Sequence, residues 1–247
     1  CHIIEDGQTI DTDIIRDIAA DNIGALIWSK SMEMNDMEKP DFLKNAMRNL
    51  SIPVITMEKY GFDCPGVDIL FDYEKGGYMA TRHLIECGHR RIGCVAGKQS
   101  FHVTMQRLNG YKKALEESGI SYDPDLVYFG DYTMESGYEA FSYILGQKVT
   151  AIFSMNDEIY RAARLYGVSI PEDISIIGFD NVPFADVMQV PLTTIGVPVI
   201  EMGKKLGEKV VDLIDNKEKL KEREEILYTP RLLVRGSTKS IPPVTVI

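Results

Sequence analysis

The sequence of 247 residues has a single tryptophan, four cysteines and no long apolar run. A transmembrane helix needs about 18 consecutive apolar residues, so we expect no segment that spans a membrane. Cys1, Cys64, Cys87 and Cys94 are irregularly spaced and form no CxxC pair, which argues against a zinc site or a disulfide framework. We therefore expect no bound metal, and reduced thiols in a cytoplasmic protein.

Positive charge is also scarce. The chain has 27 lysines and arginines against 37 aspartates and glutamates, a net charge of −10. Because DNA binding depends on cations that neutralise phosphates, we expect no DNA binding by this chain on its own. The contents of 45% hydrophobic and 26% charged residues are those of a globular protein and exclude intrinsic disorder. The length fits one large domain or two smaller ones.

Sequence signatures of catalysis are missing as well. There is no GxSxG, no HExxH and no GxxxxGK followed by Ser or Thr, and the glycines of residues 93–97 (GCVAG) lack the GxGxxG spacing. His83 and His89 lie six residues apart without a metal-binding pattern, and a lone histidine is more often a satisfied core or surface residue. The sequence therefore does not predict an enzyme or a cofactor.

What the sequence does contain is a regular alternation of short apolar runs with amphipathic segments of helical length. The apolar runs, rich in Ile and Val, are residues 23–28, 53–57, 67–71, 92–96, 126–129, 151–153 and 174–179. The segments between them are residues 13–21, 41–50, 74–87, 105–118, 136–145, 157–166 and 200–215. Three of these end at a glycine, Gly88, Gly119 or Gly167. The pattern predicts an α/β fold whose parallel sheets carry helices on both faces.

In such folds ligands bind at the carboxyl ends of the strands, and polar or aromatic residues follow almost every apolar run. They are Glu58, Asp72, residues 98–107, Asp131, Tyr132, Asn156, Asp157, Asp180 and Asn181. Carboxylates and amides bind neighbouring hydroxyl groups, and an aromatic ring covers the apolar face of a sugar, so this set suits a polyol. The alternative is that an acid after a strand caps the next helix, which we favour for Asp72 and leave open for Asp157.

The order of several motifs resembles the effector-binding part of the LacI/GalR family of bacterial transcription regulators. The resemblance covers about three quarters of the chain, residues 52–238. Its pieces, in order, are IPVITME (52–58), FDYEKGGYMATRHLIECGHRRIGCVAG (71–97), RLNGYKKALEESGI (107–120), GDYTMESGYEA (130–140), TAIFSMNDE (150–158), IPEDISIIGFDN (170–181), PLTTIGVPVIEMG (191–203) and LLVRGST (232–238).

The resemblance implies two similar, doubly wound, Rossmann-like subdomains of the type I periplasmic-binding-protein kind, with the ligand between them. Three crossover segments would join them, near residues 71–72, 195–196 and 228–230. The N-terminal subdomain would then comprise residues 1–71 and 196–228, and the C-terminal subdomain residues 72–195 and 229–247. The family's helix-turn-helix and its first strand and helix are expected to be absent from this sequence, and the helix after Asp157 is about one turn shorter than the family pattern.

The resemblance also implies ligand contacts, one position at a time. Arg107 matches an arginine that grips sugar hydroxyls or an anionic effector, Asp180 an acid that binds sugar hydroxyls, and Asn156 an amide beside it. Tyr132 stands where the family often has an aromatic ring. Glu58 replaces the usual aspartate and is one methylene longer. Phe101 and His102 belong to a loop that varies with the ligand, and we expect them to line the pocket.

The function implied is the ligand-sensing and dimerisation core of a LacI-type regulator, whose small effector, a sugar, modulates operator binding. The expected partners are this effector, a second copy of the chain, and operator DNA only through the missing N-terminal domain. For the dimer surface we expect residues 74–87 and 181–190, which carry Tyr78, Met79, Phe184, Val187 and Met188. The alternatives are a sugar-binding receptor of a transport system and, less favoured, an enzyme of α/β fold.

Overall fold

The computed structural model describes residues 23–29, 52–59, 64–157, 159–216 and 223–242. The chain folds into two units, one formed by Cys1–Phe71 and Pro198–Tyr228, the other by Asp72–Val197 and Thr229–Ile247. We call them unit 1 and unit 2. The chain therefore crosses from one unit to the other three times.

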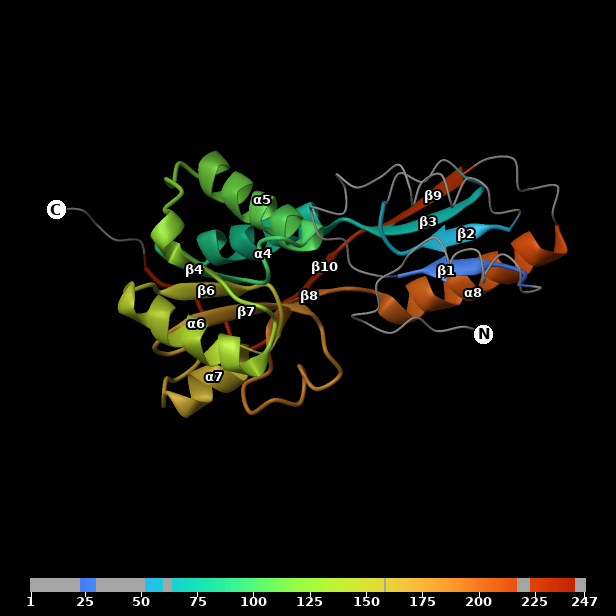
Figure 1. The fold of residues 1–247 in the computed structure, drawn as a ribbon. Coiled ribbons are helices and arrows are strands. Elements are labelled where there is room, and N and C mark those ends of the chain that lie inside the picture. The colour runs from blue at the N-terminus through green and yellow to red at the C-terminus, as the bar shows by residue number, and fades with distance from the viewer. Residues whose placement is uncertain (1–22, 30–51, 60–63, 158, 217–222, 243–247) are drawn as a thin grey trace. The chain divides into compact units, whose positions relative to one another are not determined.

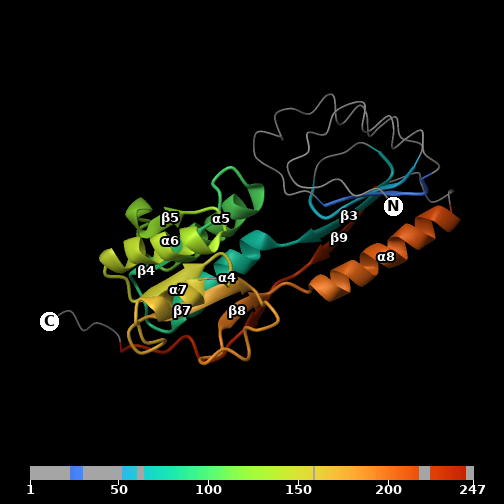
Figure 2. The same ribbon diagram turned by 60° about the horizontal axis from the view of Figure 1, so that its bottom comes forward.

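Unit 1 contains a parallel sheet with the strand order β1-β2-β3-β9 (Figure 1). The strands are β1 (Leu26–Trp28), β2 (Val54–Thr56), β3 (Gly66–Phe71) and β9 (Arg223–Tyr228). Helix α8 (Val199–Asp215) runs beside this sheet and contacts β3 (Figure 2). The helices expected at residues 13–21 and 41–50 lie outside the described residues.

A buried ion pair joins two strands of unit 1 that are far apart in the sequence. Arg223, at the start of β9, donates from Nε to Asp68 Oδ2 over 2.8 Å and also binds the second carboxylate oxygen. Asp68, on β3, is 2% exposed and also accepts from the Thr56 hydroxyl of β2. A paired carboxylate in an apolar sheet is only satisfied in one register, so this cluster fixes how β9 aligns with β3.

Unit 2 contains a six-stranded sheet with the order β10-β8-β7-β6-β4-β5. The strands are β4 (Ile92–Ala96), β5 (Val127–Phe129), β6 (Ala151–Ser154), β7 (Ser175–Asp180), β8 (Thr193–Gly196) and β10 (Arg231–Leu233). All neighbours are parallel except β10, which pairs antiparallel with β8. The prediction of parallel sheets is therefore confirmed with one exception, an edge strand from the last crossing of the chain.

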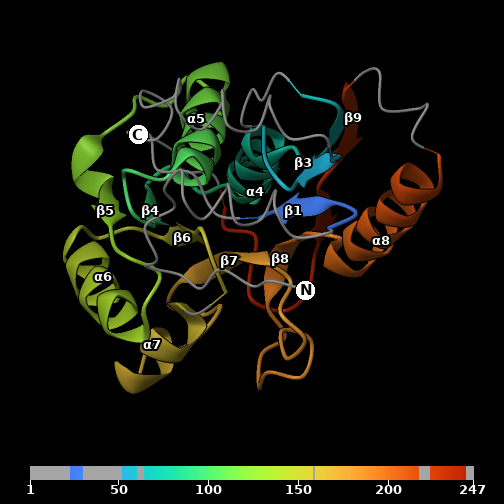
Figure 3. The ribbon, with the colours of Figure 1, turned by 45° about the vertical axis from the view of Figure 1, so that its right-hand side comes forward.

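Helices cover both faces of this sheet, as the alternation predicted (Figures 1 and 3). Helices α4 (Tyr73–Glu86) and α5 (His102–Glu117) pack together on one face, and α6 (Met134–Gly146) and α7 (Ile159–Leu165) on the other. A 3₁₀ turn (Pro124–Leu126) precedes β5. Within the described ranges, no helix is long and apolar enough to cross a membrane.

The core of unit 2 follows from the apolar runs. All residues of β4 and β6 are buried, and Phe141 and Ile144 of α6 are fully buried against the sheet. On the other face Tyr111 of α5 is fully buried, and its hydroxyl donates to the carbonyl of Ile92 over 2.9 Å. A buried tyrosine hydroxyl needs such a partner, so this hydrogen bond sets where α5 lies over β4.

The helix ends match the sequence signals. Asp72 caps α4, since its carboxylate accepts a hydrogen bond from the backbone N–H of Lys75 over 2.9 Å. The capping interpretation of Asp72 is therefore confirmed. Gly88, Gly119 and Gly167 all have a positive φ, the left-handed conformation that ends a helix without steric cost only for glycine.

Strands β8, β9 and β10 were not among the predicted elements. β10 is only three residues long, and β9 (REEILY) is half-exposed and carries charges, so neither shows an apolar run. Helix α5 also begins three residues earlier than expected, at His102.

Candidate functional site

Five parallel strands of unit 2 end at one edge of the sheet, and six of the seven predicted ligand contacts lie there. Phe101, His102 and Arg107 follow β4, Tyr132 follows β5, Asn156 follows β6, and Asp180 is the last residue of β7. We call this the carboxyl edge of unit 2. Glu58 follows β2 in unit 1 instead, and its role stays a prediction.

Arg107, on the second turn of α5, is the centre of this edge. Its side chain is 8% exposed, and its guanidinium carbon lies 3.9 Å from the ring centre of Phe179 and 5.0 Å from that of Tyr73. One terminal nitrogen donates to the carbonyl oxygen of Met155, next to Asn156, and the other to Asp180 Oδ1 over 3.3 Å. The aromatic rings and the carboxylate together compensate the loss of hydration of the guanidinium.

Two adjacent glycines in α4 make this arrangement possible. A methyl group on Gly77 would lie 2.1 Å from the carbonyl oxygen of Arg107, and one on Gly76 would lie 2.7 Å from the ring of Phe179. Helix α4 therefore approaches the backbone of α5 and the ring of Phe179 on β7 more closely than larger residues at these two positions would permit.

Two effects act in opposite directions on the pKa of Asp180. Burial raises the pKa of the Asp180 carboxyl above its ordinary value, and the neighbouring Arg107 charge acts in the other direction. The Nε of Arg107 is buried and has no hydrogen-bond partner within the described part of the chain. The guanidinium therefore keeps one unsatisfied donor, an uncommon and costly feature of a folded protein.

Tyr132 is held in a fixed position at the same edge. Its hydroxyl oxygen lies 2.8 Å from Thr104 Oγ1, and burial raises the pKa of the phenol. The ring lies directly against Gly97, where a methyl group would come within 2.0 Å of the ring carbons. Residue 97 must therefore be glycine for Tyr132 to occupy this place.

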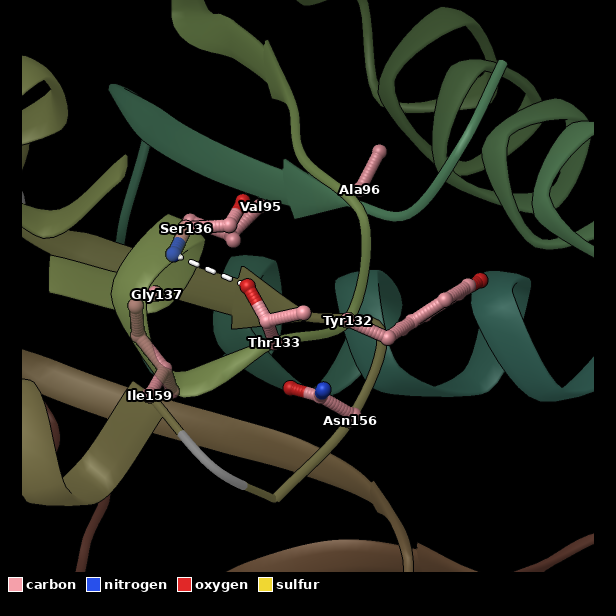
Figure 4. A pocket seen from close by; sticks show the side chains of 8 residues that line it. All are labelled: Val95, Ala96, Tyr132, Thr133, Ser136, Gly137, Asn156 and Ile159. Atoms are coloured by element: carbon pink, nitrogen blue, oxygen red, sulfur yellow. Dashed lines mark hydrogen bonds between the residues drawn. The ribbon is translucent and has the colours of Figure 1, made fainter. Parts of the chain in front are cut away.

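Asn156 shares a small pocket with Tyr132, as Figure 4 shows. The pocket is lined by Val95, Ala96, Tyr132, Thr133, Ser136, Gly137, Asn156 and Ile159. Thr133 caps helix α6 by accepting from the backbone N–H of Ser136 over 3.2 Å. Strands β4 and β6 and helices α6 and α7 thus meet at this pocket, with an amide side chain at its wall.

Phe101 and His102 stand where α5 begins. The Nζ of Lys98 lies 5.4 Å from the ring centre of Phe101, a cation–π contact within the loop. His102 is partly buried, which lowers the pKa of its imidazole. Neither residue lines the pocket of Figure 4, so their part in ligand binding stays a prediction.

Strained backbone concentrates at the carboxyl edge. Tyr132, Asp180 and Asn181 have φ values of 68°, 101° and 57°, whereas non-glycine residues avoid positive φ. Each such residue costs about 1–3 kcal/mol, and strain of this kind gathers at functional sites. Among the described residues only Lys148 shares this feature elsewhere, in the turn after α6.

Asp157 does not behave as a simple helix cap. The residue is 1% exposed. Its Oδ2 accepts from the Val182 amide over 2.9 Å, and its Oδ1 accepts from the Thr194 hydroxyl over 2.8 Å. Burial raises the pKa of the carboxyl to about 6. Sequence reasoning missed Tyr73 and Phe179, because only tertiary packing brings their rings to Arg107. Thr104 lies in the candidate range 98–107, but its contact with Tyr132 was not predicted.

His89, away from this edge, is satisfied within the fold. His89 is 1% exposed, and its ring nitrogens lie 2.9 Å from Thr150 Oγ1, 3.1 Å from Ser175 Oγ and 3.1 Å from the carbonyl oxygen of Lys239. Cys64, Cys87 and Cys94 are free thiols, and burial raises the pKa of Cys94. In the ranges that the structure covers, no three acidic, cysteine or histidine side chains gather as a metal site.

The fold and this edge define a class of binding domain, and comparison with known proteins identifies it. The model of the periplasmic binding protein-like domain matches residues 81–238. The chain belongs to this family, in the form of the effector domain of LacI-family transcriptional regulators.

Three relatives illustrate the match. The HTH-type transcriptional repressor PurR of Photobacterium profundum is 36% identical over 208 residues, which are 81% of this chain and 61% of that repressor's length. A transcriptional regulator CelR–cellobiose complex has a TM-score of 0.76 at 29% identity over 91% of this chain and 69% of that one. A LacI family regulator from Enterococcus faecium with bound ribose has a TM-score of 0.76 at 26% identity over 95% and 86%.

These relatives are transcriptional regulators, not enzymes. The chain spans less than two thirds of the length of the PurR repressor that it matches. The likeness therefore concerns the effector domain, and it supports the regulator over the transport receptor and the enzyme among the alternatives raised by the sequence.

Proposed function

We propose that this chain is the effector-sensing part of a LacI-type transcriptional regulator, and that its effector is a neutral sugar bound at the carboxyl edge of unit 2. Arg107, Asp180, Asn156 and Tyr132 are the proposed contacts. The observation that carries the proposal is the environment of Arg107. Its side chain is buried, contacts the rings of Tyr73 and Phe179 and is paired with Asp180, and its Nε has no hydrogen-bond partner among the described residues.

The charge balance at this edge favours a neutral ligand. Arg107 is paired with Asp180, and the positive charge of Lys98 lies near Asp131, whose pKa is lowered by hydrogen bonds from Thr133 and, to a lesser degree, by that charge. Arg107 therefore already has a carboxylate partner. A phosphorylated effector would have to compete with Asp180 for Arg107, whereas hydroxyl groups bind to a carboxylate and a guanidinium together.

The side chains also favour a sugar over a flat apolar ligand. Asp180 offers carboxylate oxygens, Asn156 an amide, and Tyr132 an aromatic ring fixed by Thr104 and Gly97. Hydroxyl groups and the C–H face of a pyranose or furanose ring match this combination. Two of the similar solved structures carry cellobiose and ribose.

In the whole protein, effector binding would change operator affinity through an N-terminal DNA-binding domain and a homodimer in the cytoplasm. A ligand shifts such an equilibrium only by its differential affinity for the two states, typically about 1–3 kcal/mol. The net charge of −10 disfavours DNA contact by this chain itself and so supports a separate DNA-binding domain.

A thermal-shift screen tests the proposal. The chain is mixed separately with D-ribose, cellobiose and further neutral monosaccharides and disaccharides, with sugar phosphates, and with nucleobases. We expect a neutral sugar to raise Tm, because a ligand at 100 times its Kd adds about 2.7 kcal/mol of stability. A shift with a sugar phosphate or a nucleobase alone would contradict the neutral-sugar proposal.

The site is tested with two carboxylate variants. Asp180→Ala should weaken binding of the sugar found in the screen by roughly 1.5–3 kcal/mol in calorimetry, because a hydrogen bond to a charged group is lost. Asp173→Ala is the matched control, since Asp173 accepts from the Ser169 amide over 2.9 Å just before β7, at the opposite end of that strand. Equal binding by the wild type and Asp180→Ala would remove Asp180 from the site.

A further inference from the structure

A buried carboxylate outside the proposed site, that of Asp157, contacts the turn that carries Asp180. Asp180 and Asn181 both have a positive φ, a backbone conformation that residues with a Cβ atom avoid. Such a strained turn persists only when surrounding contacts over-determine it. The contacts that hold this turn therefore decide whether Asp180 faces Arg107.

Asp157 supplies the contacts on one side. Its Oδ2 accepts from the backbone N–H of Val182, directly after the strained pair, and its Oδ1 accepts from the hydroxyl of Thr194 on β8. One side chain thus connects the end of β6 with the turn after β7 and with the neighbouring strand β8.

The backbone of β7 is shaped to admit this carboxylate. A methyl group on Gly178 would lie 2.0 Å from Asp157 Oδ1. The carboxylate therefore lies directly on the strand two residues before Asp180, a place that only a glycine leaves free.

Arg235 holds the turn from the other side. Its guanidinium donates to Asn181 Oδ1 over 2.8 Å and to the carbonyl oxygen of Leu192 over 2.7 Å, and its backbone N–H donates to Thr193 Oγ1 over 2.9 Å. Asn181 and Val182 are thus fixed separately, by Arg235 and by Asp157.

We propose that Asp157 is a positioning residue for effector recognition, acting through the Val182 amide and the Thr194 hydroxyl to hold Asp180 toward Arg107. Asp157 needs no contact with the effector for this role. The inference rests on the proposed function for its consequence in binding, while its structural part, the control of the turn, can be measured without any ligand.

The ligand-free experiment is amide hydrogen exchange at residues 178–183 in the full chain. Asp157→Ala should speed exchange at the Val182 amide about ten-fold or more, because the acceptor of that N–H is gone. Asp157→Asn should restore most of the protection, since its carbonyl oxygen can accept from Val182 while its amide donates to Thr194. Asp173→Ala, the control, should leave the Val182 amide unchanged. Unchanged exchange in Asp157→Ala overturns the proposal.

The binding experiment uses D-ribose and cellobiose by calorimetry at a temperature where every variant is folded. We expect Asp157→Ala to weaken the sugar that binds about ten-fold, Asp157→Asn to regain most of the affinity, and Asp173→Ala to bind as the wild type does. If Asp157→Ala does not fold, Thr194→Val replaces it, because it removes one of the two partners and keeps the carboxylate.

The outcomes separate the two proposals. Wild-type affinity in a folded Asp157→Ala protein overturns the positioning role, and so does an equal loss in Asp173→Ala, which would reveal a general effect of stability. If the wild type binds neither sugar but the Val182 amide still exchanges faster in Asp157→Ala, the result counts against the proposed effector. The same result supports the inference that Asp157 holds the turn.

Discussion

Arg107 and Asp180 are 73 positions apart in the sequence, yet Arg107 Nη2 lies 3.3 Å from Asp180 Oδ1 at the carboxyl edge of unit 2. One side chain comes from helix α5 and the other from the last residue of strand β7. Their meeting depends on the close packing of α4 against α5 and β7, where Gly76 and Gly77 lie. The site is therefore sensitive to changes in the core beneath it.

The contact between α4 and α5 gives a prediction about stability. A methyl group on Gly110 would lie 2.0 Å from the carbonyl oxygen of Glu74, a backbone atom that cannot move aside. We expect Gly110→Ala to lower the free energy of unfolding by about 1–3 kcal/mol in urea denaturation. Gly146→Ala, at the end of α6 with nothing within 4 Å among the described residues, should be neutral or stabilising by up to about 1 kcal/mol. Equal effects of the two changes would refute this account of the packing.

His89 gives a prediction about acid pH. Burial lowers the pKa of this imidazole below its ordinary value, and its ring lies against Thr150, Ser175 and Lys239. The unfolded chain then binds the proton more readily than the folded one, so the stabilisation is present above about pH 6.5 and is lost as the pH falls below it.

Urea denaturation between pH 7.5 and pH 5 measures this effect in the wild type and in His89→Gln. We expect the wild type to lose more stability than the variant over this range. His83 and His102 also have lowered pKa values, but both are present in the two proteins, and their contribution cancels in the difference. Parallel curves would show that His89 does not titrate in this way.

Asp157 should have the opposite dependence. Burial raises its pKa from 3.8 to about 6, so the folded protein binds this proton more readily than the unfolded chain between these pH values. Stability due to this group therefore falls as the pH rises from about 4 to 6. As the pH rises over that interval, the free energy of unfolding of Asp157→Asn should increase relative to that of the wild type by up to about 3 kcal/mol. The reason is that the asparagine carries no charge to bury. A difference that stays constant with pH would contradict the raised pKa.

Much of this fold could be predicted from the sequence, because strands buried on both faces leave a visible record. The runs at residues 92–96 and 174–179 and the glycines that end three of the helices are such signals. The antiparallel strand β10 could not be predicted, since three residues paired at a sheet edge show no period. The role of Asp157 could not be chosen either, because its partners Val182 and Thr194 are 25 and 37 residues away.

The homodimer stays a prediction: two of the side chains expected at its surface, Val187 and Phe184, are exposed, whereas Met188 packs against the core of unit 2. Val187 is 77% exposed and Phe184 37%, in the segment between β7 and β8, and the guanidinium carbon of Arg161 lies 5.7 Å from the Phe184 ring centre. We expect a dimer by light scattering at micromolar concentration, and a shift toward the monomer for Val187→Asp, because a charge would be buried in the interface. Leu165→Asp is a control at another exposed apolar residue. A wild-type mass near one chain would defeat the prediction.

The most direct test of the account is a crystal structure of the chain with the neutral sugar that raises its Tm. We expect sugar hydroxyl groups within about 3.2 Å of the Asp180 carboxylate and of Arg107, with the ring of Tyr132 against the sugar. Asp157 should keep its hydrogen bonds to Val182 and Thr194 without touching the ligand. A sugar bound elsewhere on the chain, with Arg107 and Asp180 contacting only each other, would contradict the central claim.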